Sequence, residues 1–415
     1  MAKVLVIDDD VIVQTILSRR LEAEGHEVLT AADGEAGWNL ACAQKPAVVI
    51  LDLMMPKMHG FAVIEAIRKD PTLSQVRIIV GSMKGSASDA RSALQIGADR
   101  YLTKPVPPDQ MASTVAELLG TMPASKAGTA SFFVRFWGTR GSIATPGPKT
   151  VRYGGNTSCT EVRFGDQILI FDAGTGIREL GDSLLREFRA QPIRASLFVG
   201  HTHWDHIQGW PFFLPAYIPS NEFSLYSARA VGKPLERIFR GQMDSDYFPV
   251  LLSDMKAVLK FVELSEPVTI GPVTMSYTYL NHPGIAIGFR ATAGGKAVAY
   301  LSDHESFSRM YGEATGAGED RRIAEFVQGA DLLICEAQYT EEEYTKKKGW
   351  GHSTFDDALR LAGETGVRQL AIFHHDPTHD DDFMDGVIAE CCQKIRAAKL
   401  SLQCFGAREG QVVQV

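Results

Sequence analysis

Hydrophobic and polar positions follow two alternating periods over the first 120 residues. Short runs rich in apolar residues, which are typical of strands, occupy residues 3–7, 26–31, 47–53, 76–81 and 100–104. Segments with apolar residues three or four positions apart, typical of helices, lie between these runs and again at about 109–120. This regular alternation of strands and helices predicts a doubly wound α/β domain with a five-stranded parallel sheet.

The periodicity stops at residues 120–131 and then resumes with a different character. The segment GTMPASKAGTAS is rich in glycine, alanine, serine and threonine, which favours a linker. From Phe132 onwards short apolar strands with frequent glycines predominate, and helical patterns such as DDALRLAGETG are interspersed. We therefore predict a first domain over 1–121, a linker over 122–131 and a second, α+β domain over 132–415.

Composition narrows the class of protein. The 415 residues suffice for two domains, and a hydrophobic content of 45% excludes a disordered or fibrous chain. The sequence contains no apolar run of about 18 residues or more, so no membrane span is predicted. The N-terminus has no signal-peptide pattern and the six cysteines form no CxxC motif, so a cytoplasmic protein is expected. The net charge of −8 disfavours a large nucleic-acid footprint, although a local basic groove stays open.

Acidic and polar side chains follow four of the predicted strands in the first domain. Asp8 and Asp9 follow the first strand, Asp52 ends the third, Ser82 follows the fourth and Lys104 ends the fifth. The carboxyl ends of parallel strands share one edge of a sheet, so the carboxylates are expected to meet there. Their repulsion favours a hard divalent cation such as Mg²⁺, and the lysine and hydroxyl suit a phosphoryl group. A carboxylate of this kind can form an aspartyl phosphate.

These residues lie within VLVIDDD, ILDLMMPKMHG, IIVGS and YLTKP. Over roughly residues 2–120 the chain resembles the receiver domain of bacterial two-component response regulators. The resemblance implies that Asp52 is the phosphoacceptor and that a sensor histidine kinase or phosphotransfer protein is the partner. It implies a magnesium site formed by Asp8, Asp9, Asp52 and the backbone carbonyl of Met54. It also implies three switch residues: Ser82, Tyr101 and Lys104.

Histidines concentrate in the second domain. Nine of the eleven lie between His201 and His379, and the densest motif is HTHWDH at 201–206, directly after the apolar strand ASLFVG. Its four candidate ligands cannot share one face of a strand, and a helix would split them onto two faces. A loop can wrap them around two adjacent metal ions, and imidazole and carboxylate ligands suit Zn²⁺, with Mn²⁺ or Fe as alternatives.

Further candidate ligands follow apolar strands later in the chain. His282 follows VTMSYTYLN, Asp303 follows AVAYLS, and the adjacent His374 and His375 follow QLAIF. An aspartate can bridge two ions through its two oxygens while histidines complete each ligand set. Two ions held in this way acidify a water and stabilise the oxygens of an in-line displacement, so we expect a dinuclear hydrolytic centre.

This pattern resembles the metallo-beta-lactamase fold over roughly residues 132–415, which implies an αββα sandwich. The resemblance implies two ligand sets and a bridge: His201, His203 and His282 for one metal, Asp205, His206 and His374 for the other, and Asp303 between them. The segment FDAGTG at 171–176 matches the early aspartate-glycine turn of the family, which makes Asp172 a supporting residue behind the ligands.

The roles of three other histidines stay open in this interpretation. His374 is preferred to His375 because the last ligand of the family directly follows its strand. His375, His304 and His379 are expected either to support the ligands or substrate or to be ordinary surface residues.

Two further segments indicate which branch of this family the second domain resembles. WGHST at 350–354 places His352 in a turn before a helix, and CEAQYT at 335–340 places Glu336 at the end of an apolar strand. With the glycine-rich segment 136–162 they resemble the phosphodiesterase branch, which comprises tRNA 3′-end endonucleases and cyclic-phosphate and cyclic-nucleotide phosphodiesterases. The resemblance implies that His352 is the general acid and Glu336 its orienting partner, and Asp205 is grouped with them as catalytic.

Together the two halves predict a response regulator whose metal-dependent phosphodiesterase output is gated by phosphorylation of Asp52. The sequence has no long glycine-rich arm for gripping tRNA, so a small phosphodiester such as a cyclic nucleotide is favoured over nucleic acid. The pattern also leaves open a thioester or lactone hydrolase on the same fold and a non-catalytic metal-binding module. No membrane partner is expected, and a homodimer stays open.

Overall fold

The computed structural model describes residues 2–82, 92–104, 106, 108–119, 131–189, 191–228 and 233–415. The chain divides into two compact units, Met1–Thr129 and Ala130–Val415. Apart from Ser131, the predicted linker over 122–131 lies outside the described residues. Within the described stretches, no helix combines the length and the apolar character needed to cross a membrane.

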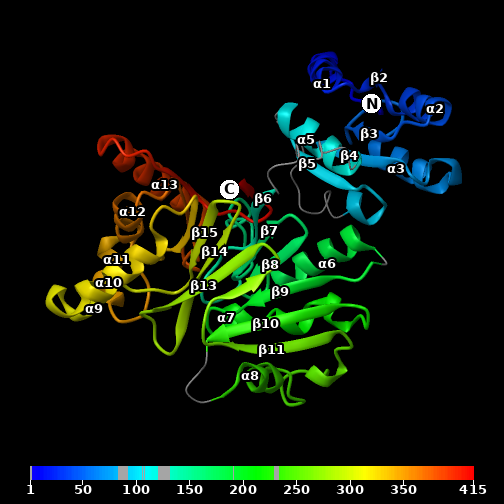
Figure 1. Cartoon of the computed structure of the whole chain (residues 1–415). Helices are drawn as coiled ribbons and strands as arrows, with labels where there is room; N and C mark the ends of the chain where they lie inside the picture. Colours follow the sequence, from blue (N-terminus) through cyan, green and yellow to red (C-terminus); the bar gives the residue numbers. More distant parts are fainter. Residues whose placement is uncertain are drawn as a thin grey trace. The chain divides into compact units, whose positions relative to one another are not determined.

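The first unit is built on a parallel sheet with the strand order β2-β1-β3-β4-β5. Its strands are β1 (Lys3–Ile7), β2 (Glu27–Ala31), β3 (Val48–Leu51), β4 (Arg77–Ser82) and β5 (Arg100–Thr103). Its helices are α1 (Val11–Ala23), α2 (Gly34–Gln44), α3 (Gly60–Lys69) and α5 (Pro108–Leu119), with the 3-10 turn η1 (Pro71–Leu73). Helices α1 and α5 lie on one face of the sheet and α2 and α3 on the other (Figure 1), and the buried side chains of each pair pack against the sheet. The predicted doubly wound fold is confirmed.

The second unit contains two seven-stranded sheets. The first, in the order β11-β10-β9-β8-β7-β6-β19, comprises β6 (Phe132–Gly138), β7 (Cys159–Phe164), β8 (Gln167–Phe171), β9 (Arg194–Phe198), β10 (Glu222–Ala228), β11 (Val258–Leu264) and β19 (Val412–Gln414). The second, in the order β12-β13-β14-β15-β16-β17-β18, comprises β12 (Val268–Ile270), β13 (Val273–Leu280), β14 (Ala286–Ala293), β15 (Lys296–Leu301), β16 (Leu332–Glu336), β17 (Gln369–Phe373) and β18 (Gln403–Gly406).

Helices cover the outer face of each sheet (Figure 1). Those of the second unit are α6 (Ile177–Phe188), α7 (Trp204–Ile207), α8 (Leu235–Gln242), α9 (Phe307–Tyr311), α10 (Glu313–Val327), α11 (Glu341–Lys347), α12 (Phe355–Glu364) and α13 (Asp381–Ala397). The 3-10 turns are η2 (Trp210–Phe212), η3 (Leu214–Tyr217) and η4 (Leu252–Asp254). Helix α6 packs on the first sheet, and α10, α12 and α13 pack on the second. The predicted αββα sandwich is therefore confirmed.

Aromatic side chains fill the space between the two sheets. Phe171 of the first sheet stacks on Phe289 and Tyr300 of the second, with ring centroids 5.7 and 5.0 Å apart. This shared core fixes the sheets against each other, since stacked aromatic pairs add to the apolar area they bury. The ends of β8 and β9 in one sheet, and of β13, β15, β16 and β17 in the other, carry the candidate ligands and their partners.

Candidate functional site

The first unit gathers three carboxylates at one edge of its sheet. Asp8, Asp9 and Asp52 each offer an oxygen within 4.8 Å of the others. Lys104 Nζ donates to Asp8 Oδ2 and to Asp52 Oδ2, both at 2.8 Å. Burial raises the pKa of Asp8, and the hydrogen bond from Lys104 opposes that rise. A cluster of three carboxylates and one lysine is under-compensated in charge, and all its oxygens suit Mg²⁺.

The predicted switch residues lie on β4, on β5 or directly after β5. Ser82 is buried at the end of β4, and its carbonyl accepts the backbone N–H of Lys104 at 3.0 Å. Tyr101 lies on β5 and packs half-buried against the core of the first unit. Met54 follows Asp52 in the loop after β3, and its N–H donates to Asp52 Oδ1 at 3.3 Å. All the residues predicted for phosphoryl chemistry therefore lie on β1, β3, β4, β5 or the loops directly after them.

The HTHWDH motif is a loop only in its first half. His201 lies in the loop after β9, whereas residues Trp204–Ile207 form the short helix α7 with His203 at its N-cap. The prediction of a loop throughout was wrong. His201 and His203 belong to one group of candidate ligands, whereas Asp205 and His206 belong to another.

A first cluster gathers His201, His203, His282 and Asp303, with one ligand atom of each within 4.8 Å of the others. His282 Nε2 lies 3.1 Å from His203 Nδ1. Asp303 Oδ2 lies 3.4 Å from His201 Nε2 and 3.6 Å from His282 Nε2. Both ring nitrogens of His201 are buried with no hydrogen-bond partner among the described residues. Burial lowers the pKa of His282 to about 4, which keeps its ring neutral. Imidazole nitrogens that face one another, together with the buried His201 ring that has no hydrogen-bond partner, suit a divalent metal ion.

A second cluster gathers Asp205, His206, Asp303 and His374, all of them buried. His374 Nε2 lies 3.1 Å from both His206 Nε2 and Asp205 Oδ2. Burial disfavours the charged form of Asp205, but the imidazoles of His206 and His374 hold its pKa well below the usual range. Asp303 Oδ1 lies 3.2 Å from His206 Nε2 and from His374 Nε2, while Oδ2 faces the first cluster. The geometry thus permits the bridging role predicted for Asp303.

Hydrogen bonds on the far side of the rings orient two of these histidines. The His206 Nδ1–H donates to Asp172 Oδ2 at 2.8 Å, and the His282 Nδ1–H donates to the Gly351 carbonyl at 2.9 Å. Each bond leaves Nε2 directed at its cluster. Such outer contacts set the tautomer and the orientation of imidazoles in metal sites, so the donor set fits two metal ions with Asp303 between them.

Three residues in or beside the clusters have a backbone conformation that is strained for residues other than glycine. Ser142, Asp172 and His374 have φ values of +62°, +61° and +59°, in the left-handed region that favours glycine. The Ser142 N–H donates to Asp205 Oδ2 at 2.7 Å, and His374 Nδ1 lies 2.8 Å from the side-chain nitrogen of Gln338. Strained residues persist where the surrounding structure requires one side-chain direction, and such residues cluster at functional sites.

The other histidines singled out from the sequence point elsewhere. The His375 Nε2–H donates to the Ala407 carbonyl at 2.9 Å, and burial lowers its pKa to about 3. His304 Nδ1 accepts a backbone N–H at 3.1 Å, and His379 Nε2 lies 2.8 Å from a glutamate of α11. All three are buried, so the alternative that they are surface residues is wrong. The structure brings His374, not His375, into the second cluster.

Glu336 and His352 lie beside the second cluster. Glu336 is the last residue of β16 and is fully buried; its Oε1 accepts the Ser353 N–H at 2.6 Å, and its Oε2 lies 3.6 Å from His352 Nδ1. The His352 ring stacks on His374 with centroids 5.4 Å apart. Burial disfavours charge on His352, but Glu336 and Asp303 outweigh it and raise the pKa of this imidazole.

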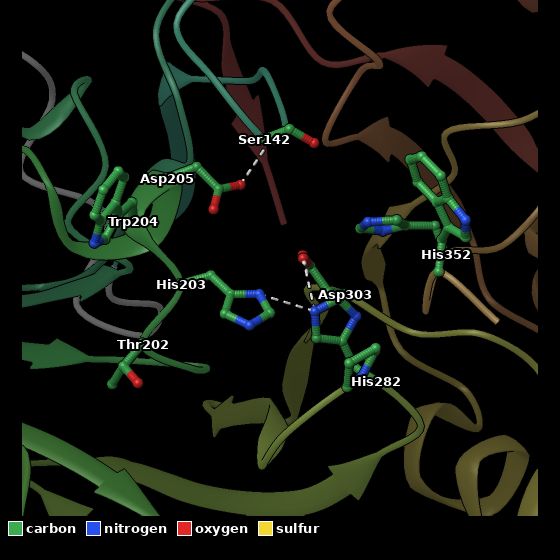
Figure 2. Close-up of a pocket in the computed structure, with 10 residues that line it drawn as sticks. Ser142, Thr202, His203, Trp204, Asp205, His282, Asp303 and His352 are labelled. Carbon is green, nitrogen blue, oxygen red and sulfur yellow. Dashed lines mark hydrogen bonds and ion pairs between the residues drawn. The ribbon is translucent and has the colours of Figure 1, made fainter. Parts of the chain in front are cut away.

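A pocket of about 500 Å³ opens over both clusters. It is lined by Ser142, Thr202, His203, Trp204, Asp205, His282, Pro283, Asp303, Trp350 and His352. Figure 2 shows His203 and Asp205 on one side of this space and His352 on the other, with Asp303 and His282 between them. Candidate metal ligands and the candidate general acid His352 therefore face one shared, solvent-accessible volume.

Several residues that shape the site were missed in the sequence. Ser142 directs Asp205, Gln338 contacts His374, and the Tyr300 O–H donates to Asp172 Oδ2 at 2.6 Å. Tyr300 lies three residues before Asp303, and Gln338 lies two residues after Glu336. These short distances in sequence were the only signal for the two residues. Ser142 carried none, because its contact with Asp205 spans 63 residues.

Comparisons with known proteins agree with both folds. Residues 4–116 match the response regulator receiver domain, and residues 167–375 match the beta-lactamase superfamily domain. Over 117 residues the chain is 42% identical to the probable transcriptional regulator ycf27 of Guillardia theta. The match covers 28% of this chain and 45% of that protein. The chain spans about half the length of the curated relatives it matches.

Two solved structures resemble a larger share of the chain. The metallo-beta-lactamase fold protein YhfI from Bacillus subtilis is 20% identical, with a TM-score of 0.48, over 69% of this chain and 100% of that one. The short form of human tRNase Z is 18% identical, with a TM-score of 0.46, over 68% of this chain and 98% of that one. From the family matches, the chain belongs to the beta-lactamase superfamily and carries a response regulator receiver domain ahead of its superfamily domain.

Proposed function

We propose that this chain is a two-component response regulator whose output domain is a dinuclear-metal phosphodiesterase. The observation that carries the proposal is the Glu336–His352 pair, whose imidazole lines the same pocket as residues of both His/Asp clusters. The clusters would hold two divalent ions, Zn²⁺ by the chemistry of the ligands, with Mn²⁺ or Fe as alternatives. Such ions supply an activated water and stabilise charge on phosphoryl oxygens.

The protein's own groups account for the remaining steps. His352 Nδ1 faces Glu336, so its other ring nitrogen is the one that donates a proton to the leaving oxygen. Glu336 is itself fixed by the Ser353 N–H, which keeps the imidazole in one orientation. Asp205, which the Ser142 N–H directs into the pocket, completes the polar wall opposite His352.

The pocket supports a small phosphodiester such as a cyclic nucleotide. Its volume of about 500 Å³ lies in the range of small-molecule sites, about 300–1,000 Å³. The net charge of −8 weighs against an extended nucleic-acid surface, so tRNA is the less favoured substrate.

The substrate class is tested by screening metal-replete protein against cyclic mononucleotides, cyclic dinucleotides, 2′,3′-cyclic phosphates and tRNA precursors. For the substrate found, His352→Ala is expected to lower kcat about 100-fold or more while both metal ions stay bound. His379→Ala, a buried histidine outside the pocket, is the matched control. Hydrolysis of thioesters or lactones alone, or unchanged phosphodiesterase activity in His352→Ala, would contradict the proposal.

Gating by the receiver domain is the second part of the proposal. Asp52 accepts the phosphoryl group from a histidine kinase or phosphotransfer protein, with Mg²⁺ held by Asp8, Asp9, Asp52 and the Met54 carbonyl. Phosphorylation shifts an equilibrium between conformations only through differential contacts, for which a few kcal/mol suffices. Acetyl phosphate is expected to change the hydrolysis rate of wild type and to leave Asp52→Asn unchanged. Equal wild-type rates, with phosphorylation confirmed by mass, would contradict gating.

A further inference from the structure

A buried carboxylate outside both clusters holds the loop that carries His352. Glu305 is 1% exposed. Its Oε1 accepts the Tyr344 O–H at 2.6 Å and the Gly349 N–H at 3.0 Å, and its Oε2 accepts the Gly351 N–H at 3.0 Å. Among the described residues, no lysine or arginine forms an ion pair with it. Burial of an unpaired carboxylate is unfavourable unless hydrogen bonds compensate its charge, and here the compensating donors belong to one loop and the helix before it.

The loop bound by Glu305 packs tightly on a candidate metal ligand. Gly351 has a φ of +85°, and a Cβ at this position would lie 2.3 Å from His282 Nδ1 and 2.4 Å from Pro283 Cδ. The Gly351 carbonyl accepts the His282 Nδ1–H at 2.9 Å. Any shift of this peptide therefore reorients the His282 ring, whose Nε2 faces the first cluster.

The same loop carries the proposed general acid. Gly349 and Gly351, the two residues whose N–H groups bind Glu305, flank Trp350, which lines the pocket, and His352 follows directly. Glu305 also lies two residues after Asp303 in the segment that follows β15. One short segment thus supplies the bridging carboxylate and anchors the loop on the other side of the pocket.

We propose that Glu305 is a positioning residue: through residues 349–352 it directs His282 at the first cluster and His352 at the leaving oxygen. The effect on His352 rests on the proposed function, whereas the effect on His282 is independent of any reaction. Glu305 itself touches neither cluster; it acts through the loop.

The test is Glu305→Gln, which keeps the volume but replaces one acceptor oxygen with an NH₂ donor. Even with its oxygen at the Oε2 position, where it can still accept the Gly349 and Gly351 N–H groups, the amide is uncharged. Hydrogen bonds to a charged acceptor are roughly twice as strong as neutral ones, so the loop is held less firmly. We expect the affinity for one of the two metal ions to fall about 10–100-fold, as for other outer contacts of metal ligands. A chromophoric chelator in competition with zinc measures this without substrate.

A second readout separates positioning from a general loss of structure. Hydrolysis of a phosphodiester with an alkoxide leaving group needs a proton donor, whereas p-nitrophenolate leaves without one. We expect Glu305→Gln to lower kcat at least about 10-fold more for the alkoxide substrate than for bis(p-nitrophenyl) phosphate. Glu341→Gln, which alters a carboxylate of α11 bonded to Arg309 and Thr354, is the matched control and should change neither ratio.

Each outcome decides the proposal. Wild-type zinc affinity in Glu305→Gln together with equal loss on both substrates would overturn it. If wild type hydrolyses no phosphodiester, the proposed function fails, and zinc affinity alone decides the role of Glu305. If Glu305→Gln does not fold, Glu305→Asp, which keeps the charge but withdraws it by one methylene, takes its place with the same readouts.

Discussion

Asp172 offers a sharp test of how the second cluster is held, because asparagine replaces it with nearly the same volume. Asp172 Oδ2 accepts the His206 Nδ1–H at 2.8 Å and the Tyr300 O–H at 2.6 Å, and Oδ1 accepts the Gly200 N–H at 2.7 Å. The φ of Asp172 is +61°, a conformation that asparagine also tolerates, so Asp172→Asn adds no backbone strain. The substitution removes one acceptor oxygen and the charge.

The magnitude follows from the three donors. An amide oxygen turned toward His206 and Tyr300 leaves its NH₂ group against the Gly200 N–H, so at least one buried donor loses its acceptor. That loss lowers the free energy of unfolding by about 1–3 kcal/mol. The His206 ring also loses a charged partner, for which metal affinity falls about 10–100-fold in comparable sites. Each factor of ten corresponds to about 1.4 kcal/mol.

Zinc competition with a chromophoric chelator measures the affinity of Asp172→Asn, and urea unfolding measures its stability. Asp166→Asn, at an exposed position in the turn between β7 and β8, is the matched control and should match wild type in both. A folded Asp172→Asn protein with wild-type affinity for both ions would refute the reasoning that the carboxylate orients His206.

Three other predictions follow from the packing and the clusters. His374→Ala should retain one zinc ion per chain by elemental analysis, whereas His375→Ala should retain two, because only His374 faces the second cluster. Phe171→Ala should lower the free energy of unfolding in urea by about 3–5 kcal/mol, since this ring stacks between the two sheets. Gly81→Ala should raise the stability of the receiver unit by about 0.5–1 kcal/mol, because the nearest atoms to an added Cβ are 3.9 Å away.

The fold was largely predictable because its strands are short, continuous apolar runs. Phe132–Gly138 and Gln369–Phe373, for example, coincide with runs that end at glycine or histidine. The pairing of strands was not predictable in the same way. β19, at the end of the described chain, pairs with β6: Val413, for example, lies opposite Val134, and no local pattern links segments so far apart in the sequence.

Residues of the candidate site were likewise predictable only where a local sequence pattern marks them. Asp205 and His206 could be found because they lie in one dense motif, and His282 and Asp303 because each follows a strand. Residues that only support these groups depend on tertiary contacts, as Glu305 does through its bonds to residues 349–351. The helix α7 was missed because four residues are too few to show a helical period.

The central claim is that two metal ions share Asp303 between the two clusters. Elemental analysis of zinc-replete, dialysed wild type and Asp303→Asn tests it most directly, with circular dichroism to confirm the fold. We expect two ions per chain in wild type and at most one in Asp303→Asn, because asparagine keeps a single oxygen, which can face only one of the two clusters. One ion or none in wild type, or two ions in folded Asp303→Asn, would contradict the claim.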